Sequence, residues 1–496
     1  MESSRGFELK TIQKKTWIAL ALACIVFPAG FLIASALVYK IGFPLDDAWI
    51  HQTFARNLAL YGEWAFVHGQ SSAGSTSPLW SVLLSIAYYL HINPYVWTFA
   101  LGWLSLFGTA VAGEMLFRVH HPEAKFWFPW VGVMLAAEWH LVWSADSGME
   151  TGLMAAVVVL TFMLLSLGNI HWFIIGCVLG VSVWLRPDGL TLLGPVLLVA
   201  VFCWNGRLKT KAYSVIKVII GFLLFFLPYL YFNYRISGNW WPNTFYAKQA
   251  EYQILTTQPF ITRIANLAVL PFVGVGLLLL PAAGFMVFYA LKTKNWLVIA
   301  FFLWWAGYTV IYAWRLPVTY QHGRYLMPAM PIIFLMGALG YFQLFKTRQK
   351  TKLLNYFFTI WLASCIGVGG GFYVIGAVQY AQDVAIIETE MVKTALWVRD
   401  NTSPDALIAV HDIGAMGYFS DRKILDLAGL VSPEVIPFIR DEAKMQDYLE
   451  SQKADYLVVF PSWYPTLIQN WKPVYVSTGK FSPAQGGENM VIYVPK

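Results

Sequence analysis

The sequence predicts a polytopic α-helical membrane protein that ends in a small α/β domain. Only 12% of its 496 residues are charged and 58% are hydrophobic, whereas an ordinary globular protein is about 25% charged and 45–50% apolar. The mean hydropathy is +0.56, and apolar runs long enough to cross the roughly 30 Å hydrocarbon layer recur along the chain. The four cysteines all lie in apolar runs without C-x-x-C spacing, so neither a disulfide framework nor a zinc site is predicted.

The first apolar run, Trp17 to Val38, predicts an uncleaved membrane span. Lys14 and Lys15 precede it, and Ala34-Ser35-Ala36 resembles a cleavage site. The run is nevertheless longer than the roughly 7–15 apolar residues of a signal peptide. We therefore expect a first transmembrane helix whose N-terminal end lies in the cytoplasm.

Further apolar runs bring the total to about eleven predicted crossings. The stretch Pro78 to Leu90 is apolar but short, and it fits a re-entrant or juxtamembrane helix better than a crossing. The remaining predicted spans are Phe99–Phe117, Phe126–Trp143, Thr151–Leu167, Trp172–Leu185, Leu190–Trp204, Val215–Phe232, Leu267–Leu291, Trp296–Tyr312, Leu326–Phe345 and Leu354–Ile375.

The basic residues orient the predicted spans. The net charge of +7 comes from residues scattered between apolar runs, so it does not predict a nucleic-acid-binding face. If Pro78–Leu90 does not cross, the basic loops share one side with the N-terminus, and Lys- and Arg-rich loops favour the cytoplasm. We therefore expect an exported C-terminal end. The basic loops are Arg118–Lys125, Arg207–Lys217, Lys292–Lys294 and Lys346–Lys352.

Two domains are predicted. Residues 1–378 form the membrane domain, with its first external loop at residues 40–77, and residues 379–496 form a soluble extracytoplasmic domain. Helix and strand patterns alternate in the second part, which is typical of a small α/β domain. Its predicted helices are Glu388–Asp400 and Ser432–Glu450, and its predicted strands are Ala406–Val410, Tyr456–Phe460, Val474–Ser477 and Met490–Val494.

Two adjacent acids, Asp46 and Asp47, open the first external loop. They follow a membrane span and precede a helical pattern through Phe54, Leu58 and Tyr61, which places them at a helix N-terminus beside the membrane. One interpretation is that either acid caps that helix at the water interface. The other is that a carboxylate accepts a proton from a substrate hydroxyl or binds a divalent cation.

Charged and polar residues recur at the other predicted external turns. Any one of them fits a solvated loop residue, but several on one membrane face favour a polar site, because ionisable groups beside a bilayer are costly unless paired or used. These residues include Asp146, Glu150, Arg186, Asp188, Asn243, Tyr246, Lys248, His322 and Arg324.

This set of residues suits a displacement at a carbon that is linked to phosphate. A carboxylate would activate the acceptor, and fixed cations would stabilise the phosphate leaving group. Aromatic side chains such as Trp49 fit either stacking on sugar faces or an interfacial aromatic belt. The candidate phosphate ligands are Arg186, Lys248, His322 and Arg324.

Several motifs resemble those of bacterial GT-C fold glycosyltransferases, and in particular the terminal arabinofuranosyltransferases of actinobacterial cell walls. The more specific ones are Leu45-Asp46-Asp47-Ala48-Trp49-Ile50 in the first loop and Pro242-Asn243-Thr244. One difference is the pair Ala48-Trp49, where the family motif has a smaller or tyrosine-bearing pair, and this bears on donor fit. Ser147–Thr151, Arg186–Gly189, Arg324-Tyr325, His411–Gly414 and Asp426–Gly429 are also similar to that group.

The resemblance implies a hexosyl- or pentosyltransferase in the bacterial cytoplasmic membrane. Its donor would be a polyprenyl-phosphate-linked sugar and its acceptor an envelope glycan or lipid, with transfer on the extracytoplasmic face and inversion at the anomeric carbon. By this resemblance Asp46 would be the general base, and Asp47 would assist it or contact a divalent metal (Mg or Mn), a requirement that stays open. Further substrate contacts are expected from Glu150, Asn243, Tyr246 and Trp49.

Two other interpretations remain open. A transporter or lipid-glycan flippase without bond cleavage would line a path with charges inside its spans, yet Glu114 and Glu138 are the main ones, and no inverted repeat is visible. A membrane-anchored binding protein would act through its exported domain. In that domain His411 and Asp412 fit a strand-end turn better than a catalytic dyad, and the resemblance implies that the domain contacts the acceptor glycan or shapes the site.

Overall fold

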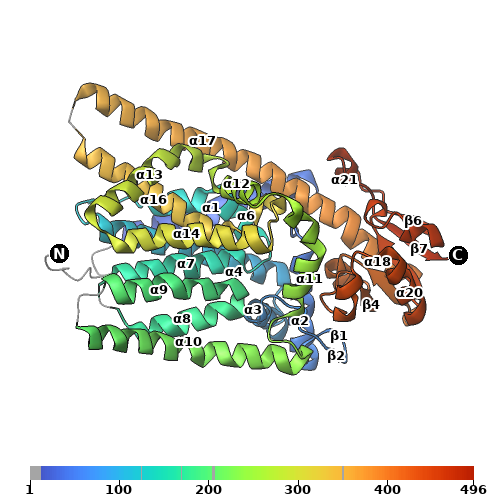
Figure 1. Ribbon diagram of the computed structural model, residues 1–496. Helices are drawn as coiled ribbons and strands as arrows, with labels where there is room; N and C mark the ends of the chain where they lie inside the picture. The colour runs from blue at the N-terminus through green and yellow to red at the C-terminus, as the bar shows by residue number, and fades with distance from the viewer. Residues whose placement is uncertain (1–12, 125, 169, 204–206, 349–350) are drawn as a thin grey trace.

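The computed structural model describes residues 13–124, 126–168, 170–203, 207–348 and 351–496. A bundle of long helices carries a small sheet-containing domain at one end (Figure 1). Among the described residues, seven helical runs are long and apolar enough to cross a membrane. They are α1 (Lys14–Val38), α4 (Pro94–His120), α10 (Leu208–Ser237), α13 (Val275–Thr293), α14 (Trp296–Arg315), the run Tyr320–Thr347 that contains α16 (Met330–Thr347), and the run Lys352–Asn401 that begins with α17 (Lys352–Ile386).

The other predicted spans fall on shorter or broken helices. Within the predicted span Phe126–Trp143 the helix breaks at Glu138, whose carboxylate accepts hydrogen bonds from the N–H groups of His140 (3.0 Å) and Leu141 (3.2 Å) and so caps a new helix. The total of about eleven crossings stays a prediction. The shorter helices are α5 (Trp130–Ala137), α6 (Trp139–Asp146), α7 (Thr151–Ser166), α8 (Trp172–Leu185), and α9 (Leu193–Leu198) with the π-helical η3 (Val199–Cys203).

Glycines let neighbouring helices of the bundle pack backbone against backbone. A Cβ atom on Gly176 of α8 would lie 2.2 Å from the carbonyl oxygen of Val218 on α10. One on Gly340 of α16 would lie 1.9 Å from the carbonyl oxygen of Ala282 on α13. Both distances exclude a larger residue, and such close approach through small residues is typical of membrane helices.

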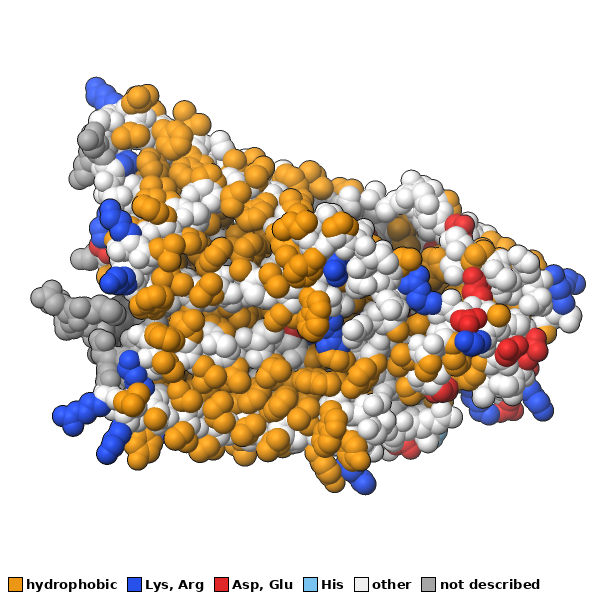
Figure 2. Space-filling view, viewed as in Figure 1, with side chains coloured by type: hydrophobic (Ala, Val, Ile, Leu, Met, Phe, Trp, Pro, Cys, Tyr) orange, Lys and Arg blue, Asp and Glu red, His pale blue; other side chains and the backbone are white. Residues whose placement is uncertain are grey.

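On the face seen in Figure 2, a broad hydrophobic surface covers the bundle, and charged side chains gather at its two ends. Lys209 at the start of α10, Lys346 near the end of α16 and Lys352 at the start of α17 belong to the end remote from the C-terminal domain. The basic loops and the C-terminal domain therefore lie at opposite ends, although which membrane face each end occupies stays a prediction. Lys125 and residues 349–350 of the predicted basic loops lie outside the described residues.

The end of the bundle beside the C-terminal domain carries the loop of residues 40–77, which was predicted to be external, and several short helices (Figure 1). α3 (Pro78–Tyr89) has 12 residues, which span about 18 Å and do not cross a hydrocarbon layer of about 30 Å. The other elements here are α2 (Asp47–Tyr61), β1 (Ala65–Val67), β2 (Gln70–Ser71), η2 (Pro187–Leu192), α11 (Asn243–Glu251), η4 (Tyr252–Thr257), α12 (Phe260–Ala268), η5 (Leu270–Phe272), α15 (Tyr320–Gly323) and η6 (Met327–Ala329).

The C-terminal domain is built on a five-stranded sheet in the order β4-β3-β5-β7-β6. β3 runs parallel to β4 and β5, whereas β7 runs antiparallel to β5 and β6. Parallel neighbours need crossover connections, and α19 and α20 supply them. The strands are β3 (Leu407–Val410), β4 (Lys423–Asp426), β5 (Tyr456–Val459), β6 (Trp471–Val476) and β7 (Val491–Pro495), and the helices are α18 (Lys393–Asn401), α19 (Ile413–Phe419), η8 (Pro433–Phe438), α20 (Glu442–Gln452), η9 (Pro461–Trp463), η10 (Leu467–Asn470) and α21 (Phe481–Ala484).

α17 joins the two domains without a break. It runs through the predicted boundary between residues 378 and 379 and continues through the π-helical η7 (Ile387–Val392) into α18. Glu390 of η7 is fully buried and accepts hydrogen bonds from Asn489 (3.1 Å) and from the N–H group of Met490 (3.0 Å). The sheet domain is therefore anchored directly to the last membrane helix.

Candidate active site

A cavity of about 350 Å³ lies where the bundle meets the C-terminal domain. Its volume falls within the range of about 300–1,000 Å³ that is usual for small-molecule sites. Leu430 is its wall residue from the C-terminal domain, and the other walls come from the bundle and the turns at this end of it. The ionisable residues that line it are Asp47, His51, Glu150, Arg186, Asp188, Lys248, Arg315 and Arg324, with the phenols Tyr312 and Tyr325.

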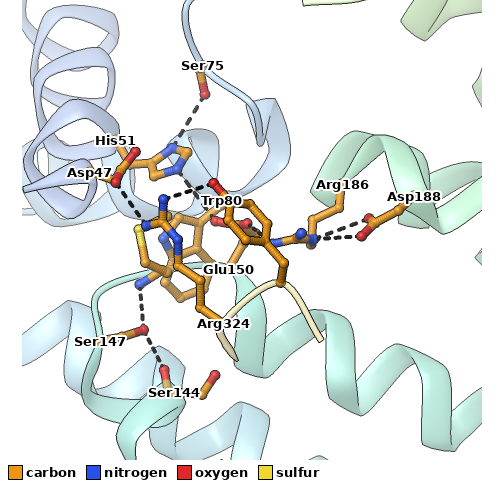
Figure 3. Close-up of polar contacts among 12 residues, drawn as sticks. Asp47, His51, Ser75, Trp80, Ser144, Ser147, Glu150, Arg186, Asp188 and Arg324 are labelled. Carbon is orange, nitrogen blue, oxygen red and sulfur yellow. Dashed lines mark hydrogen bonds and ion pairs between the residues drawn. The ribbon is translucent and has the colours of Figure 1, made fainter. Parts of the chain in front are cut away.

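Asp47 is the first residue of α2 and faces two cations across the cavity. Its Oδ2 accepts a hydrogen bond from Nη1 of Arg324 (2.8 Å), and its Oδ1 lies 3.8 Å from Nζ of Lys248. Figure 3 shows Asp47 and Arg324 pointing toward one another. Burial raises the pKa of Asp47, but the charges of Arg324 and Lys248 outweigh it and hold that pKa well below its usual range. Asp47 is therefore an ionised carboxylate.

Asp46 points away from the cavity, toward the C-terminal domain. Its two carboxylate oxygens accept hydrogen bonds from the backbone N–H groups of Gly414 (2.7 Å) and Ala415 (2.8 Å) at the start of α19. Burial and the nearby carboxyl group of Asp412 raise the pKa of Asp46 to about 8. Consecutive side chains at a helix start do not face the same way, so the predicted acid pair is divided between a cavity and a domain contact.

Arg186 is held by two carboxylates and a phenol. Nη1 donates to Oε1 of Glu150 (2.9 Å), Nε donates to Oδ2 of Asp188 (3.1 Å), and Nη2 donates to the hydroxyl of Tyr312 (2.9 Å). Figure 3 shows its guanidinium group extending toward Glu150 and Asp188. Burial raises the pKa of Glu150, but His51 and Arg186 lower it, and the net value is about 2. The charge of Arg186 is thus already balanced.

His51 lines the cavity and was not among the predicted site residues. Its Nδ1 lies 3.0 Å from Oγ of Ser81, and its Nε2 lies 3.5 Å from Oε2 of Glu150. His51 follows Asp47 by four residues on α2, and residues four apart share a helix face. That spacing was the signal from which His51 could have been found.

Arg315, the last residue of α14, is a second cavity residue that the sequence did not single out. Its guanidinium group lies over the ring of Phe245 and donates to the carbonyl oxygen of the same residue (3.0 Å). It forms no ion pair with an acid anywhere in the described ranges. It is therefore a cavity cation whose charge is not already neutralised.

The cavity brings together only part of the predicted site. Asp47, Glu150, Arg186, Lys248 and Arg324 line it. Outside the lining, Asp46 contacts α19, Trp49 packs with Tyr418 and Phe419, the N–H group of Asn243 bonds to the carbonyl oxygen of Ala73, Tyr246 packs edge-on against Phe245, and His322 bonds through Nε2 to Asp383 (2.8 Å).

In the C-terminal domain, His411 follows β3 and its side chain has a hydrogen-bond partner, which agrees with the strand-end turn that the sequence favours over a catalytic dyad. Nδ1 of His411 lies 2.8 Å from the hydroxyl of Tyr464, and its Nε2 lies 3.6 Å from Oε1 of Glu251 on α11. Burial lowers the pKa of His411, but Glu251 and Asp412 outweigh it and raise that pKa above its usual value. His411 thus connects the domain to α11 instead of pairing with Asp412.

The donor set around Asp47 does not fit a divalent cation. Both of its oxygens face positively charged side chains, whereas such ions need several oxygen ligands. Within the residues that the structure covers, no group of three or more His, Cys, Asp or Glu side chains is arranged to hold a metal. Whether the protein needs Mg or Mn, which the sequence left open, is not tested by the structure.

Solved structures define the fold as the GT-C fold of membrane glycosyltransferases, as the sequence motifs predicted. ArnT from Cupriavidus metallidurans bound to undecaprenyl phosphate is 13% identical, with a TM-score of 0.61 and coverage of 97% of this chain and 98% of that one. The archaeal oligosaccharyltransferase AglB from Archaeoglobus fulgidus, in complex with an inhibitory peptide and a dolichol-phosphate, is 10% identical, with a TM-score of 0.61 over 93% of this chain and 72% of that one.

A mycobacterial structure shares the same architecture. The arabinofuranosyltransferase AftD is 13% identical, with a TM-score of 0.53 over 96% of this chain, which matches 40% of the AftD chain. A family model described as "Domain of unknown function (DUF8728)" matches residues 375–493, and no curated protein sequence matches significantly. At these identities the comparisons establish the fold.

Proposed function

We propose that this protein is a membrane glycosyltransferase that moves a sugar from a polyprenyl-phosphate donor to an envelope glycan or lipid acceptor. The observation that carries the proposal is the cavity at the end of the apolar bundle, where one ionised carboxylate, Asp47, faces a set of cations. ArnT and AglB, which share the fold, were solved with undecaprenyl phosphate and a dolichol-phosphate. We place the transfer on the extracytoplasmic face, with the N-terminus in the cytoplasm.

The reaction is a single displacement at the anomeric carbon. A bond forms between the acceptor oxygen and that carbon while the bond from the carbon to the phosphate oxygen breaks, and the sugar is inverted. The acceptor proton goes to a base, and polyprenyl phosphate leaves with the bonding electrons. Asp47 is the base that the geometry supports, because it lines the cavity whereas Asp46 does not.

Arg315 is the proposed anchor of the donor phosphate. A phosphate needs donors whose charge is available, and guanidinium groups bind it through charge-assisted hydrogen bonds. Arg186 is already held by Glu150 and Asp188, whereas Arg315 bonds to the backbone of Phe245 and forms no ion pair with an acid among the described residues. Lys248 and Arg324 complete the set of cations, because each can exchange part of its contact with Asp47 for the phosphate.

The test is turnover by the purified full chain in lipid nanodiscs. Labelled polyprenyl-phosphate sugars of hexose and pentose types are offered with candidate acceptors, and released polyprenyl phosphate is measured. Asp47→Asn should lower turnover by about 10²–10⁴-fold, whereas the matched variant Asp441→Asn, a helix cap in the C-terminal domain, should retain it. Full turnover in Asp47→Asn, or translocation of a lipid without bond cleavage by the wild type, would overturn the proposal.

A further inference from the structure

We propose that the C-terminal domain, which matches a family model without a function, is a clamp in the same chain that completes the cavity. It holds α2 and α11, the elements that carry Asp47 and Lys248. Asp46, next to the cavity acid, is then a positioning residue and the main contact of the clamp. The role of the clamp in catalysis rests on the proposed function, whereas the contacts that define the clamp do not depend on it.

Side chains of the first external loop hold both ends of α19. Asp46 accepts hydrogen bonds from the N–H groups of Gly414 and Ala415. Ten residues after Asp46, on α2, Arg56 donates to the carbonyl oxygens of Tyr418 (2.8 Å) and Gly417 (3.4 Å). The first N–H and last C=O groups of a helix have no partners inside the helix. An acid at one end and a guanidinium at the other therefore satisfy both ends of α19 from another domain.

The backbone of α19 lies directly against the first loop. A Cβ atom on Gly414 would lie 2.0 Å from the carbonyl oxygen of Asp46, and one on Gly417 would lie 2.2 Å from the ring of Phe66. The ring of Trp49 packs against that of Phe419, with 4.6 Å between centroids. Burying apolar rings at this contact adds to its stability. The two glycines are what let α19 approach so closely.

A second contact reaches α11. His411, at the end of β3, lies 3.6 Å from Glu251 at the end of α11, and Lys248 lies 4.0 Å from the same carboxylate. Lys248 and Glu251 are three residues apart and share a face of α11, so the contact between His411 and Glu251 also influences the position of Lys248, the cation that faces Asp47. Leu430, from the turn after β4, completes the cavity wall.

The consequence is that the cavity keeps its geometry only while the domain is docked. Asp46 and Asp47 are consecutive residues, so fixing the carboxylate of Asp46 on α19 fixes the start of α2 and the direction of the Asp47 side chain. The Asp46 carboxylate is occupied by two backbone N–H groups and is therefore not aimed at a substrate.

The experiment compares Asp46→Ala, Arg56→Met and the double variant in the full chain. Hydrogen exchange of the amides of residues 413–419 and turnover of the lipid-linked donor are measured side by side. Both single variants should raise amide exchange at α19 and lower kcat by roughly ten- to hundredfold, with KM for the donor changing less. The double variant should lose little more than either single one, because both residues act on the same helix.

Matched variants separate the clamp from a general loss of folding. Asp441→Ala removes a carboxylate cap of α20 within the same domain and should leave both readouts at the wild-type level. Arg56→Lys keeps a donor at the end of α19 and should recover most of the activity.

Two results would overturn the clamp. One is wild-type exchange at residues 413–419 in both single variants. The other is loss of turnover in Asp46→Ala alone, which would identify Asp46 as the base. If the wild type turns over no lipid-linked sugar, the proposed function fails, and the exchange measurement still decides whether the clamp exists.

Discussion

Replacing Arg315 by Met tests the proposed phosphate anchor with little effect on the fold. Arg315 donates a hydrogen bond to the carbonyl oxygen of Phe245 (3.0 Å) and lies over the ring of that residue. No acid in the described part of the chain loses a partner when its charge is removed. Met keeps the apolar length of the side chain, so folding stability should fall by only about 1 kcal/mol.

The expected effect on lipid binding is much larger. A hydrogen bond to a charged group contributes about 1.5–3 kcal/mol, and about 1.4 kcal/mol corresponds to a tenfold change in an equilibrium constant. The dissociation constant of polyprenyl phosphate for Arg315→Met should therefore rise roughly ten- to hundredfold. The KM of the lipid-linked donor should rise with it, because donor and product share the phosphate.

Binding of labelled polyprenyl phosphate to the protein in nanodiscs measures this effect. Arg263→Met is the matched control, because Arg263 also donates to a backbone carbonyl oxygen, that of Ala313 (3.0 Å), but does not line the cavity. Unchanged affinity in Arg315→Met would refute the anchor. An equal loss of affinity in Arg315→Met and Arg263→Met would also refute the anchor, because the loss would then reflect the total positive charge at this end of the bundle.

Three further predictions concern the fold around the cavity. Arg186→Met should lower the free energy of unfolding by about 3–5 kcal/mol, measured by denaturation, because it leaves the buried carboxylate of Glu150 and the partly buried one of Asp188 without their cation. A change below about 1 kcal/mol would contradict this. His322→Ala removes the bond to Asp383 that holds the turn at residues 321–323 in its left-handed backbone conformation. Because this turn precedes Arg324, turnover should fall about tenfold. The effect should vanish in an Arg324→Ala background. Burial gives Asp46 a pKa of about 8 in the folded state, so its contribution to stability is present at low pH and is lost as pH rises from about 4 to about 8. The unfolding midpoint of Asp46→Asn should lack that slope in the same buffers, and identical slopes would show that Asp46 is not the titrating group.

The membrane part of the fold could be predicted from the sequence, because the length and hydrophobicity of each apolar run are local properties that need no knowledge of tertiary contacts. Within the described residues, each predicted span falls on one helix or on two or three consecutive helical elements, and the first-loop motif lies at the cavity. The short strand β4 (Lys423–Asp426) was missed because four residues with a charge at each end carry little alternating pattern. The α/β class of the domain survived that omission, since the other four strands were predicted.

The sequence could not predict that Asp47 lines the cavity while Asp46 contacts the C-terminal domain. It depends on α19, more than 360 positions further along the chain, and no local pattern indicates that two glycines there will dock on the first loop. Arg315 was overlooked for a similar reason. A basic residue at the end of an apolar run fits an interfacial anchor, and only the fold shows that its charge faces a cavity.

Under the proposed function, the ion pairs of the cavity would connect donor binding with activation of the acceptor. Before a phosphate enters, Arg324 and Lys248 lower the pKa of Asp47, which makes it a weak base. A phosphate that draws these two cations toward itself removes the interactions that lower that pKa, so the basicity of Asp47 rises when the donor is in place. Arg315 can receive the phosphate first, because no carboxylate in the described ranges competes for it. Under the proposed function, the base is therefore activated by the arrival of its own substrate, and an acceptor that enters an empty cavity meets a carboxylate still held by its cations.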